Sequence, residues 1–305
     1  MQDDRDSVAR YTHRAPLSAD VKTLKERLRR YYSTNQSYYV AAQENNLAFV
    51  SDEESRIFGC IPAGGLVLDV ACGTGENALA LSPIASRYVG VDISPVALAM
   101  ARSYASGRRD FHIGDMTQLP YRSGSFDAVV SKNALEHCHD PRTMLDEMCR
   151  VCKPGGKIII LAPNWEDPFI LPPPLAFKMS KRPRLVRLCR RLAYGAHRIR
   201  LQMHLLKAGR FVFETIEEPE LDGDFESDID TVYPVMAREV ANYLQYLGMR
   251  IMYLRSRNYV SLERPFFRYR SRNANIFVKN FAKSISLFKY GGGLRIIAEN
   301  SECSG

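Results

Sequence analysis

The segment L-D-V-A-C-G-T-G-E-N-A, residues 68–78, has residue types and spacing that suit the binding of a small ligand. It follows an apolar, β-branched run and precedes a helical pattern, the setting in which a glycine-rich turn holds a ligand. Gly73 and Gly75 permit backbone conformations and close approaches that a Cβ atom would block. Asp92 ends the next predicted strand, where a carboxylate can accept hydrogen bonds from both hydroxyls of a ribose. The spacing therefore predicts a site for a ribose-containing ligand.

Two kinds of ligand fit this loop. The letters G-T-G-E-N-A also satisfy the dinucleotide fingerprint G-x-G-x-x-G/A, so a dehydrogenase has to be considered. Asp69 argues against it, because a carboxylate just before the glycines would lie near a pyrophosphate and repel it. The same carboxylate suits a ligand with an ammonium group and no phosphate. S-adenosylmethionine has an ammonium, a sulfonium, a ribose and an adenine, so the electrostatics favour it.

Short apolar runs alternate with helical patterns on both sides of this loop. Such alternation predicts a parallel, doubly wound sheet with helices between the strands. The pattern breaks for some 70 residues after Pro163 and then resumes. The predicted strands are 66–70, 88–92, 110–113, 126–131, 157–163, 250–256 and 294–299, and the predicted helices are about 75–82, 95–106, 141–152 and 236–248.

Five motifs in order resemble those of class I S-adenosylmethionine-dependent methyltransferases, the group that includes ubiquinone/menaquinone-type and sugar methyltransferases. The resemblance covers about residues 64–165 and is weaker over 236–257. It implies an α/β fold with a Rossmann-like, doubly wound, seven-stranded sheet, mostly parallel, here with helical insertions after strands five and six. The motifs are LDVACGTG, VGVDIS, GDMTQLPY, FDAVVSKNALEHCHDP and EMCRVCKPGGKIIILAPN.

The same resemblance implies a site for S-adenosylmethionine. Asp69 and the two glycines would hold the methionine end, and Asp92 would take the ribose hydroxyls. Asp115 would bind the adenine amine, with Ile93 and Met116 beside the ring. Many relatives have Gly where this chain has Ala71, a common variation, and Asn133 is expected near the methionine moiety. The predicted cofactor-binding residues are Asp69, Ala71, Gly73, Gly75, Asp92, Ile93, Asp115, Met116 and Asn133.

The segment S-K-N-A-L-E-H-C-H-D-P follows the fourth strand, at the edge of the sheet where ligands bind in this architecture. Methyl transfer from a sulfonium needs positioning, and it needs a general base only when a hydroxyl must lose its proton. His137 is the best candidate for that base, because an imidazole titrates near neutral pH. The alternative is a histidine that only supports the cofactor loop. No metal site is predicted, since the acidic run with Asp224, Asp228 and Asp230 is typical of a solvated face.

The region after the fifth strand is unusual in charge. Between Pro168 and Phe213 there are eleven Lys/Arg and no acidic residue, whereas Glu214–Asp230 carries nine acidic residues and no basic one. An apolar stripe at helical spacing predicts a helix whose apolar side packs on the core with its basic side solvated. A peripheral membrane contact through residues 168–210 is the competing interpretation. Nucleic acid is disfavoured, because no recognised binding module accompanies the charge. The stripe is Leu185, Leu188, Leu192, Ala196, Ile199, Met203 and Leu206.

These patterns predict three parts: an N-terminal helical lid (1–50), a methyltransferase core (51–165 and 236–300) and a substrate-cap insertion (166–235). Tyrosines 31, 32, 38 and 39 either close the lid over the cofactor or simply pack on the sheet edge.

The 305 residues carry a formal charge of +8, with no apolar run near the ~20 residues of a membrane span and no secretory signal pattern at the N-terminus. Seven cysteines without framework spacing favour a cytoplasmic, reducing compartment, peripheral to the membrane if the insertion binds lipid.

The function expected from these observations is S-adenosylmethionine-dependent O-methylation of a sugar, glycan or lipid-linked small-molecule acceptor. Two alternatives stay open. One is a natural-product or quinone-like phenolic methyltransferase. The other is a non-catalytic binding protein with a methyltransferase fold.

Overall fold

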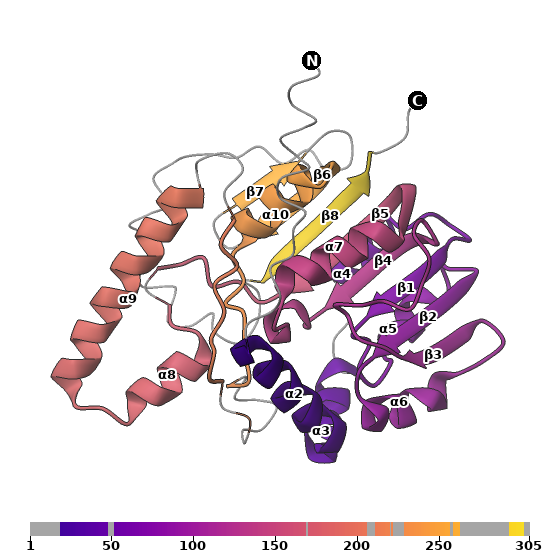
Figure 1. The fold of residues 1–305 in the computed structure, drawn as a ribbon. Helices are drawn as coiled ribbons and strands as arrows, with labels where there is room; N and C mark the ends of the chain where they lie inside the picture. Colours follow the sequence, from indigo (N-terminus) through magenta and orange to yellow (C-terminus); the bar gives the residue numbers. More distant parts are fainter. Residues whose placement is uncertain are drawn as a thin grey trace.

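A computed structural model describes residues 19–47, 52–168, 170–205, 211–219, 221, 229–256, 259–262 and 293–301. Its centre is one eight-stranded sheet with the order β3-β2-β1-β4-β5-β8-β6-β7 (Figure 1). The first five strands in this order are parallel, and β8, β6 and β7 continue the sheet in antiparallel pairs. The strands are β1 (Leu66–Val70), β2 (Arg87–Asp92), β3 (Arg109–Ile113), β4 (Phe126–Lys132), β5 (Cys152–Ala162), β6 (Met249–Ser256), β7 (Tyr259–Leu262) and β8 (Leu294–Asn300).

Side chains of successive strand residues point to opposite faces, and each face has its own apolar core. In β5, Ile158 and Ile160 belong to one core, and Ile159 and Leu161 to the other. A sheet that is covered on both faces requires continuous apolar strands such as K-I-I-I-L-A, because neither alternating position meets water. This explains why the central strands could be recognised from their sequences.

Helices cover both faces of the sheet (Figure 1). The first core is closed by α7 (Pro141–Val151) and α10 (Ala237–Tyr246), and the second by α4 (Asp52–Phe58) and α5 (Asn77–Leu81). Asp140 caps α7: its side chain accepts a hydrogen bond from the backbone N–H of Thr143, and Pro141 follows as the first helical residue. The remaining helices are α2 (Ala19–Thr34), α3 (Gln36–Leu47), α6 (Pro95–Ala101), α8 (Pro173–Ser180) and α9 (Arg184–Leu205), with 3₁₀ turns at Arg102–Tyr104 and Leu135–His137.

The predicted α/β, Rossmann-like, mostly parallel sheet is confirmed, with one addition. Seven of the strands correspond to predicted ones, and β7 is an extra edge strand that pairs antiparallel with β6. A helical insertion follows strand five, as predicted, in the form of α8 and α9. After strand six the chain first forms the β6–β7 hairpin, and the rest of that predicted insertion, residues 263–292, lies outside the described residues.

The packing predicted for α9 is wrong. Leu185, Leu188 and Leu192 of the apolar stripe are 72%, 55% and 58% exposed. The opposite side faces the protein instead, where Arg198 is only 1% exposed and Leu201 and Leu205 are buried. Spacing alone shows that a helix has an apolar side; it does not show which side meets the core.

A buried arginine explains the orientation of α9. The guanidinium of Arg198 donates hydrogen bonds to the backbone carbonyl oxygens of Trp165 (2.8 Å) and Pro234 (3.4 Å). Leu201 and Leu205 pack beside it against Met236. Buried carbonyl groups need donors, so the polar contact and two leucines outweigh the longer apolar stripe as the docking face. No helix in the described part of the chain is long and apolar enough to cross a membrane.

Candidate cofactor and active site

The loop after β1 has three residues with positive φ, a conformation that is easy for glycine and strained for other residues. Gly73 and Gly75 have φ of +54° and +86°. A Cβ on Gly75 would lie 2.9 Å from Cε1 of Phe111, so this glycine lets the loop pack tightly on β3. A Cβ on Gly73 would meet no atom within 4 Å, which leaves open space beside its backbone for a ligand. Ala71, with φ of 56°, occupies the left-handed region without being glycine, a conformation that often marks functional loops.

Asp92 ties this loop to the end of β2. Its Oδ2 accepts the N–H of Gly73 at 2.8 Å, and its Oδ1 accepts the N–H of Ser94 at 2.8 Å. Burial raises the pKa of Asp92, although these backbone N–H groups oppose the rise. A carboxylate has about four lone-pair sites, so Asp92 keeps acceptor capacity for a ribose hydroxyl beside these backbone donors.

Asp69 lies beneath the loop. It is fully buried, and its Oδ2 accepts hydrogen bonds from the hydroxyl of Tyr88 (2.7 Å) and the amide of Asn77 (3.1 Å). Its Oδ1 has no hydrogen-bond partner among the described residues. Burial raises the pKa of Asp69 to about 6, against the lowering effect of Tyr88 and Asn77. A buried carboxylate oxygen without a partner fits a ligand that brings a positive charge, as S-adenosylmethionine does.

A cavity opens at the carboxyl ends of β1 to β4, with α2 on its other side. Six of the predicted site residues line it: Ala71, Asp92, Ile93, Asp115, Met116 and His137. Asp69, Gly73, Gly75 and Asn133 do not line this cavity, and their predicted roles stay predictions. Asn133 is exposed at the end of β4, has φ of 51° and donates its backbone N–H to Leu161 O at 2.8 Å.

Four residues of α2 complete the wall: Lys25, Leu28, Arg29 and Tyr32. Nζ of Lys25 lies 2.6 Å from Oδ2 of Asp115, so this ion pair holds α2 against the part of the cavity where the adenine is predicted to bind. Burial alone would raise the pKa of Asp115, but Lys25 and the hydrogen bonds of Thr117 hold it below its usual value. The predicted lid therefore touches the site through α2. Tyr31, Tyr38 and Tyr39 pack instead against Ala97 of α6.

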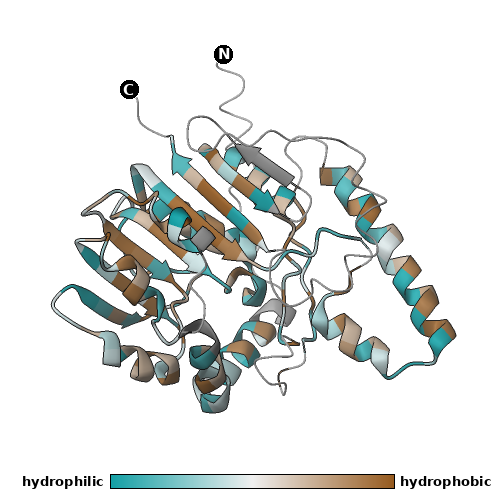
Figure 2. Ribbon diagram, turned by 180° about the vertical axis from the view of Figure 1, so that it is seen from behind, coloured by the Kyte–Doolittle hydropathy of each residue, from teal (hydrophilic) through white to brown (hydrophobic). Residues whose placement is uncertain are grey.

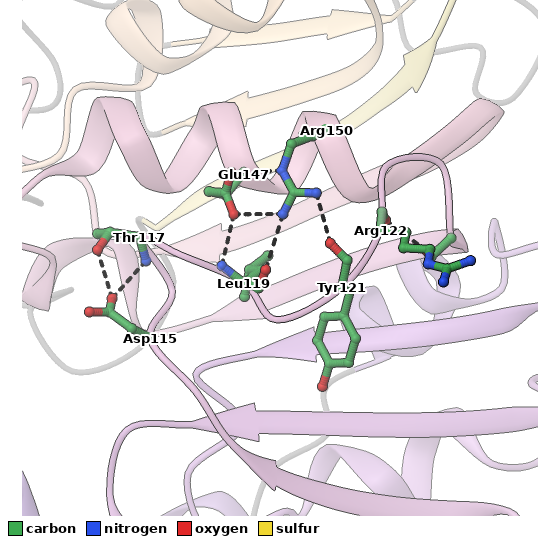
Figure 3. A network of polar contacts seen from close by, with 8 residues as sticks. Asp115, Thr117, Leu119, Tyr121, Arg122, Glu147 and Arg150 are labelled. Carbon is green, nitrogen blue, oxygen red and sulfur yellow. Dashed lines mark hydrogen bonds and ion pairs between the residues drawn. The ribbon is translucent and has the colours of Figure 1, made fainter. Parts of the chain in front are cut away.

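The segment that carries Asp115 is held in place by α7 (Figure 3). Asp115 Oδ1 accepts the backbone N–H and the hydroxyl of Thr117 at 2.8 and 2.7 Å. Further along, Glu147 accepts the N–H of Leu119 at 2.8 Å, and Arg150 donates to the carbonyl oxygens of Leu119 and Tyr121. Glu147 and Arg150 also pair with each other at 2.7 Å. This network fixes the backbone on which Asp115 and Met116 are presented, and no local pattern in the sequence predicts it.

His137, which also lines the cavity, is surrounded by polar groups. Its Nδ1 lies 3.5 Å from Oδ2 of Asp230, and its Nε2 lies 3.9 Å from Oε1 of Glu136. The same Asp230 oxygen accepts the hydroxyl of Tyr32 at 2.7 Å. Burial, followed by the charge of Asp230, raises the pKa of Tyr32 well above its ordinary value, so this hydroxyl keeps its proton. Burial also lowers the pKa of His139 nearby, with a smaller effect from Lys25.

Asp230 was predicted to belong to a solvated acidic run, and that is wrong for this residue. It is 2% exposed and is brought to the site because the backbone N–H groups of Val232 and Tyr233 both donate to Glu136 O at 2.8 Å. Asp224 and Asp228 lie outside the described residues. Within the described ranges, no cluster of His, Cys, Asp and Glu could hold a metal ion.

The chain thus folds as a doubly wound α/β domain with a buried carboxylate, Asp92, at the end of its second strand and beside the cavity. Residues 68–160 match the family model for the methyltransferase domain. An uncharacterized methyltransferase of Mycobacterium sp. (strain JLS) is 33% identical over 159 residues, 52% of this chain and 62% of that protein. The demethylmenaquinone methyltransferase of Clavibacter sepedonicus is 41% identical over 100 residues, 32% of this chain and 41% of that protein.

A solved structure has a similar fold over most of the chain. It is a candidate methyltransferase of Haloferax volcanii in complex with the Trm112 methyltransferase activator, 17% identical, with a TM-score of 0.51 over 87% of this chain and 96% of that one. Residues 68–160 therefore match a methyltransferase domain, and the sheet around them has the class I fold that the motifs predicted. It spans less than two thirds of the length of the curated relatives it matches.

Proposed function

We propose that this chain transfers the methyl group of S-adenosylmethionine to a hydroxyl group of a sugar, glycan or lipid-linked small molecule. The observation that carries the proposal is one cavity that joins the cofactor-side carboxylates Asp92 and Asp115 to His137. A hydroxyl acceptor needs a base next to the cofactor, because the hydroxyl must lose its proton. A more nucleophilic acceptor does not need one.

The residues present fit the cofactor. Asp92 would hold the ribose hydroxyls, and Ile93 and Met116 would flank the adenine, with Asp115 at its amine. One carboxylate oxygen of buried Asp69 has no partner among the described residues. Its negative charge, beneath the glycine-rich loop, would attract the ammonium group of the cofactor. When bound, the cofactor supplies an electrophilic methyl group on a sulfonium, so the protein has only to align an acceptor oxygen with it and exclude water.

His137 would take the proton of the acceptor hydroxyl. The carboxylate of Asp230 faces Nδ1 and favours the tautomer with its hydrogen there, which leaves Nε2 as the proton acceptor. The buried carboxylate of Glu136, on the Nε2 side, would stabilise the imidazolium that forms. Tyr32 donates its hydroxyl to Asp230 and so holds this carboxylate toward the ring.

A quinone-like phenolic acceptor is the second candidate. It is supported by two relatives named demethylmenaquinone methyltransferase, which match about a third of this chain at 41% and 39% identity. A phenolic hydroxyl has a pKa near 10, so it too would need His137 to remove its proton. A non-catalytic binding protein is less consistent with a cavity that contains both cofactor carboxylates and a carboxylate-supported histidine.

Two measurements test the proposal. The first is calorimetry with S-adenosylmethionine on the wild type, Asp92→Ala and the control Asp110→Ala, whose carboxylate pairs with Arg87 at the surface. We expect binding by wild type and control and at least a tenfold loss in Asp92→Ala. No binding to wild type, or equal binding to all three, would overturn the cofactor assignment.

The second measurement is formation of S-adenosylhomocysteine across sugar, glycan, lipid-linked and phenolic acceptors. Turnover that depends on a hydroxyl acceptor supports the proposal, and turnover only with phenolic quinone precursors favours the second candidate. Cofactor binding without turnover on any acceptor would favour the non-catalytic alternative.

A further inference from the structure

The exposed apolar side chains of this protein are concentrated on one helix. Of the eleven large apolar side chains exposed in the described residues, six lie on α9: Leu185, Val186, Leu188, Leu192, Ile199 and Met203. Single exposed apolar residues are normal on a protein surface, but a contiguous set marks a contact site. In Figures 1 and 2, α8 and α9 extend away from the sheet at the edge of the molecule, and apolar residues recur along the length of α9.

The stripe faces outward because the other side of the helix is anchored. Positions 185, 188, 192, 199 and 203 fall on one side at a rise of 1.5 Å per residue, which makes a stripe about 27 Å long. Arg198, Leu201 and Leu205 hold the opposite side on the protein. The first ten residues of α9 are exposed except for half-buried Arg187. The stripe is therefore held on the surface, without a partner among the described residues.

The charged residues that line the hollow beside the stripe are all positive. A hollow of about 460 Å³ lies between α8 and α9, with Leu171, Met179 and Leu188 as apolar wall and Arg184, Arg187 and Arg191 as its charged groups. These three arginines make no ion pair with any described residue. Two acidic side chains of the following segment have other partners: Glu214 pairs with His197 at 2.8 Å, and Glu218 lies 3.9 Å from Lys178.

This combination points to one kind of partner. A second copy of the chain would cover the leucines but would bring two sets of arginines together. A nucleic acid would neutralise the arginines but leave the leucines in water. The boundary of an anionic membrane meets both demands, because phosphates lie just above an apolar layer.

We propose that α8 and α9 form a membrane-docking arm, in which the stripe enters the interface of an anionic bilayer and Arg184, Arg187 and Arg191 bind lipid phosphates. The proposal does not depend on which molecule is methylated. It specifies the peripheral membrane contact predicted for residues 168–210, since the structure turns the apolar side of α9 outward.

The test is flotation of the full chain with vesicles of phosphatidylcholine alone and of phosphatidylcholine with phosphatidylglycerol (3:1) at about 0.1 M salt. We expect binding to the anionic vesicles and at least tenfold weaker partitioning to the neutral ones, with affinity falling as salt rises. Leu185→Ser/Leu188→Ser/Leu192→Ser should lose at least tenfold in partitioning. Arg184→Gln/Arg187→Gln/Arg191→Gln should lose the preference for anionic lipid.

Matched controls carry the same chemical changes elsewhere. Leu79→Ser replaces an exposed leucine of α5, and Arg102→Gln/Arg108→Gln/Arg122→Gln removes three exposed arginines from the core domain. All variants should keep the circular dichroism spectrum and cofactor affinity of the wild type. Absence of vesicle binding, equal losses in controls and arm variants, or a dimer in solution that only the leucine variant dissociates would overturn the proposal.

Discussion

Oδ2 of Asp230 lies 3.5 Å from Nδ1 of His137, although the two residues come from segments on either side of the basic insertion. Tyr32 of α2 donates its hydroxyl to the same oxygen at 2.7 Å. Three parts of the chain, the N-terminal helices, the end of β4 and the return to the core, thus meet at the predicted base. The arrangement leads to the first two predictions.

Replacing the predicted base should slow the chemical step and leave the cofactor in place. For His137→Gln we expect kcat to fall by about 10²–10⁴, the range typical of a lost general base, with S-adenosylmethionine affinity within a factor of two of wild type. Calorimetry and steady-state kinetics separate the two effects. His112→Gln, an exposed histidine on β3, is the control. If both affinity and kcat collapse together, the histidine only supports the cofactor loop.

Asp230→Asn preserves the shape of the side chain and removes its charge. We expect kcat to fall, because the tautomer and orientation of His137 lose their support. The double variant His137→Gln/Asp230→Asn should be no slower than His137→Gln alone, since residues that act as a unit are not additive. Additive losses in kcat would show that Asp230 acts independently of His137.

Asp69 should make stability depend on pH in an unusual direction. Burial raises its pKa to about 6, while an unfolded aspartate has a pKa of about 3.9. Between these values the folded state binds more protons than the unfolded state, so the free energy of unfolding falls as pH rises. The cost above pH 6 is about 3 kcal/mol, from about 1.4 kcal/mol per unit of pKa.

Asp69→Asn removes that cost. Without cofactor, urea unfolding should show the variant more stable than wild type by about 3 kcal/mol at pH 7.5 and by only about 1 kcal/mol at pH 4.5, because part of the cost is already lost there. Calorimetry should show weaker cofactor binding. Asp110→Asn, which changes a surface carboxylate, should leave the free energy of unfolding unchanged at both pH values. A difference from wild type that is the same at both pH values would contradict the assignment of the raised pKa to Asp69.

Arg198→Ala should detach α9. It removes the donor for the carbonyl oxygens of Trp165 and Pro234, and an unsatisfied buried carbonyl costs about 1–3 kcal/mol. We expect the free energy of unfolding to fall by about 2–4 kcal/mol. The fluorescence emission of Trp165, the single tryptophan of the chain, should shift to the red. Arg200→Ala, exposed on the same helix, should change stability by less than about 0.5 kcal/mol. Unchanged emission from Arg198→Ala would mean that α9 is held by its leucines alone.

Local patterns were sufficient to predict most of the core. Strands such as K-I-I-I-L-A are recognisable because both faces of the sheet are covered, and Asp140-Pro141 marks the start of α7 because capping depends on adjacent residues. The glycines and Asp92 were identifiable for the same reason: a turn and the end of a strand impose requirements on one position at a time. The β7 hairpin strand was missed because four residues, although they include the strand-favouring Tyr259 and Val260, are too short a run for alternation to be recognised.

The sheet, the glycine-rich loop and the order of the motifs can be predicted from the residues alone, because these depend on short-range periodicity and on backbone requirements at single positions. The folded structure was needed to show that Lys25 and Tyr32 line the cavity, that Asp230 is buried beside His137, and that the leucines of α9 face outward. Each of these depends on contacts between segments far apart in the chain. A residue's type and spacing state what it can bind, and the packing of distant elements determines which partner it meets.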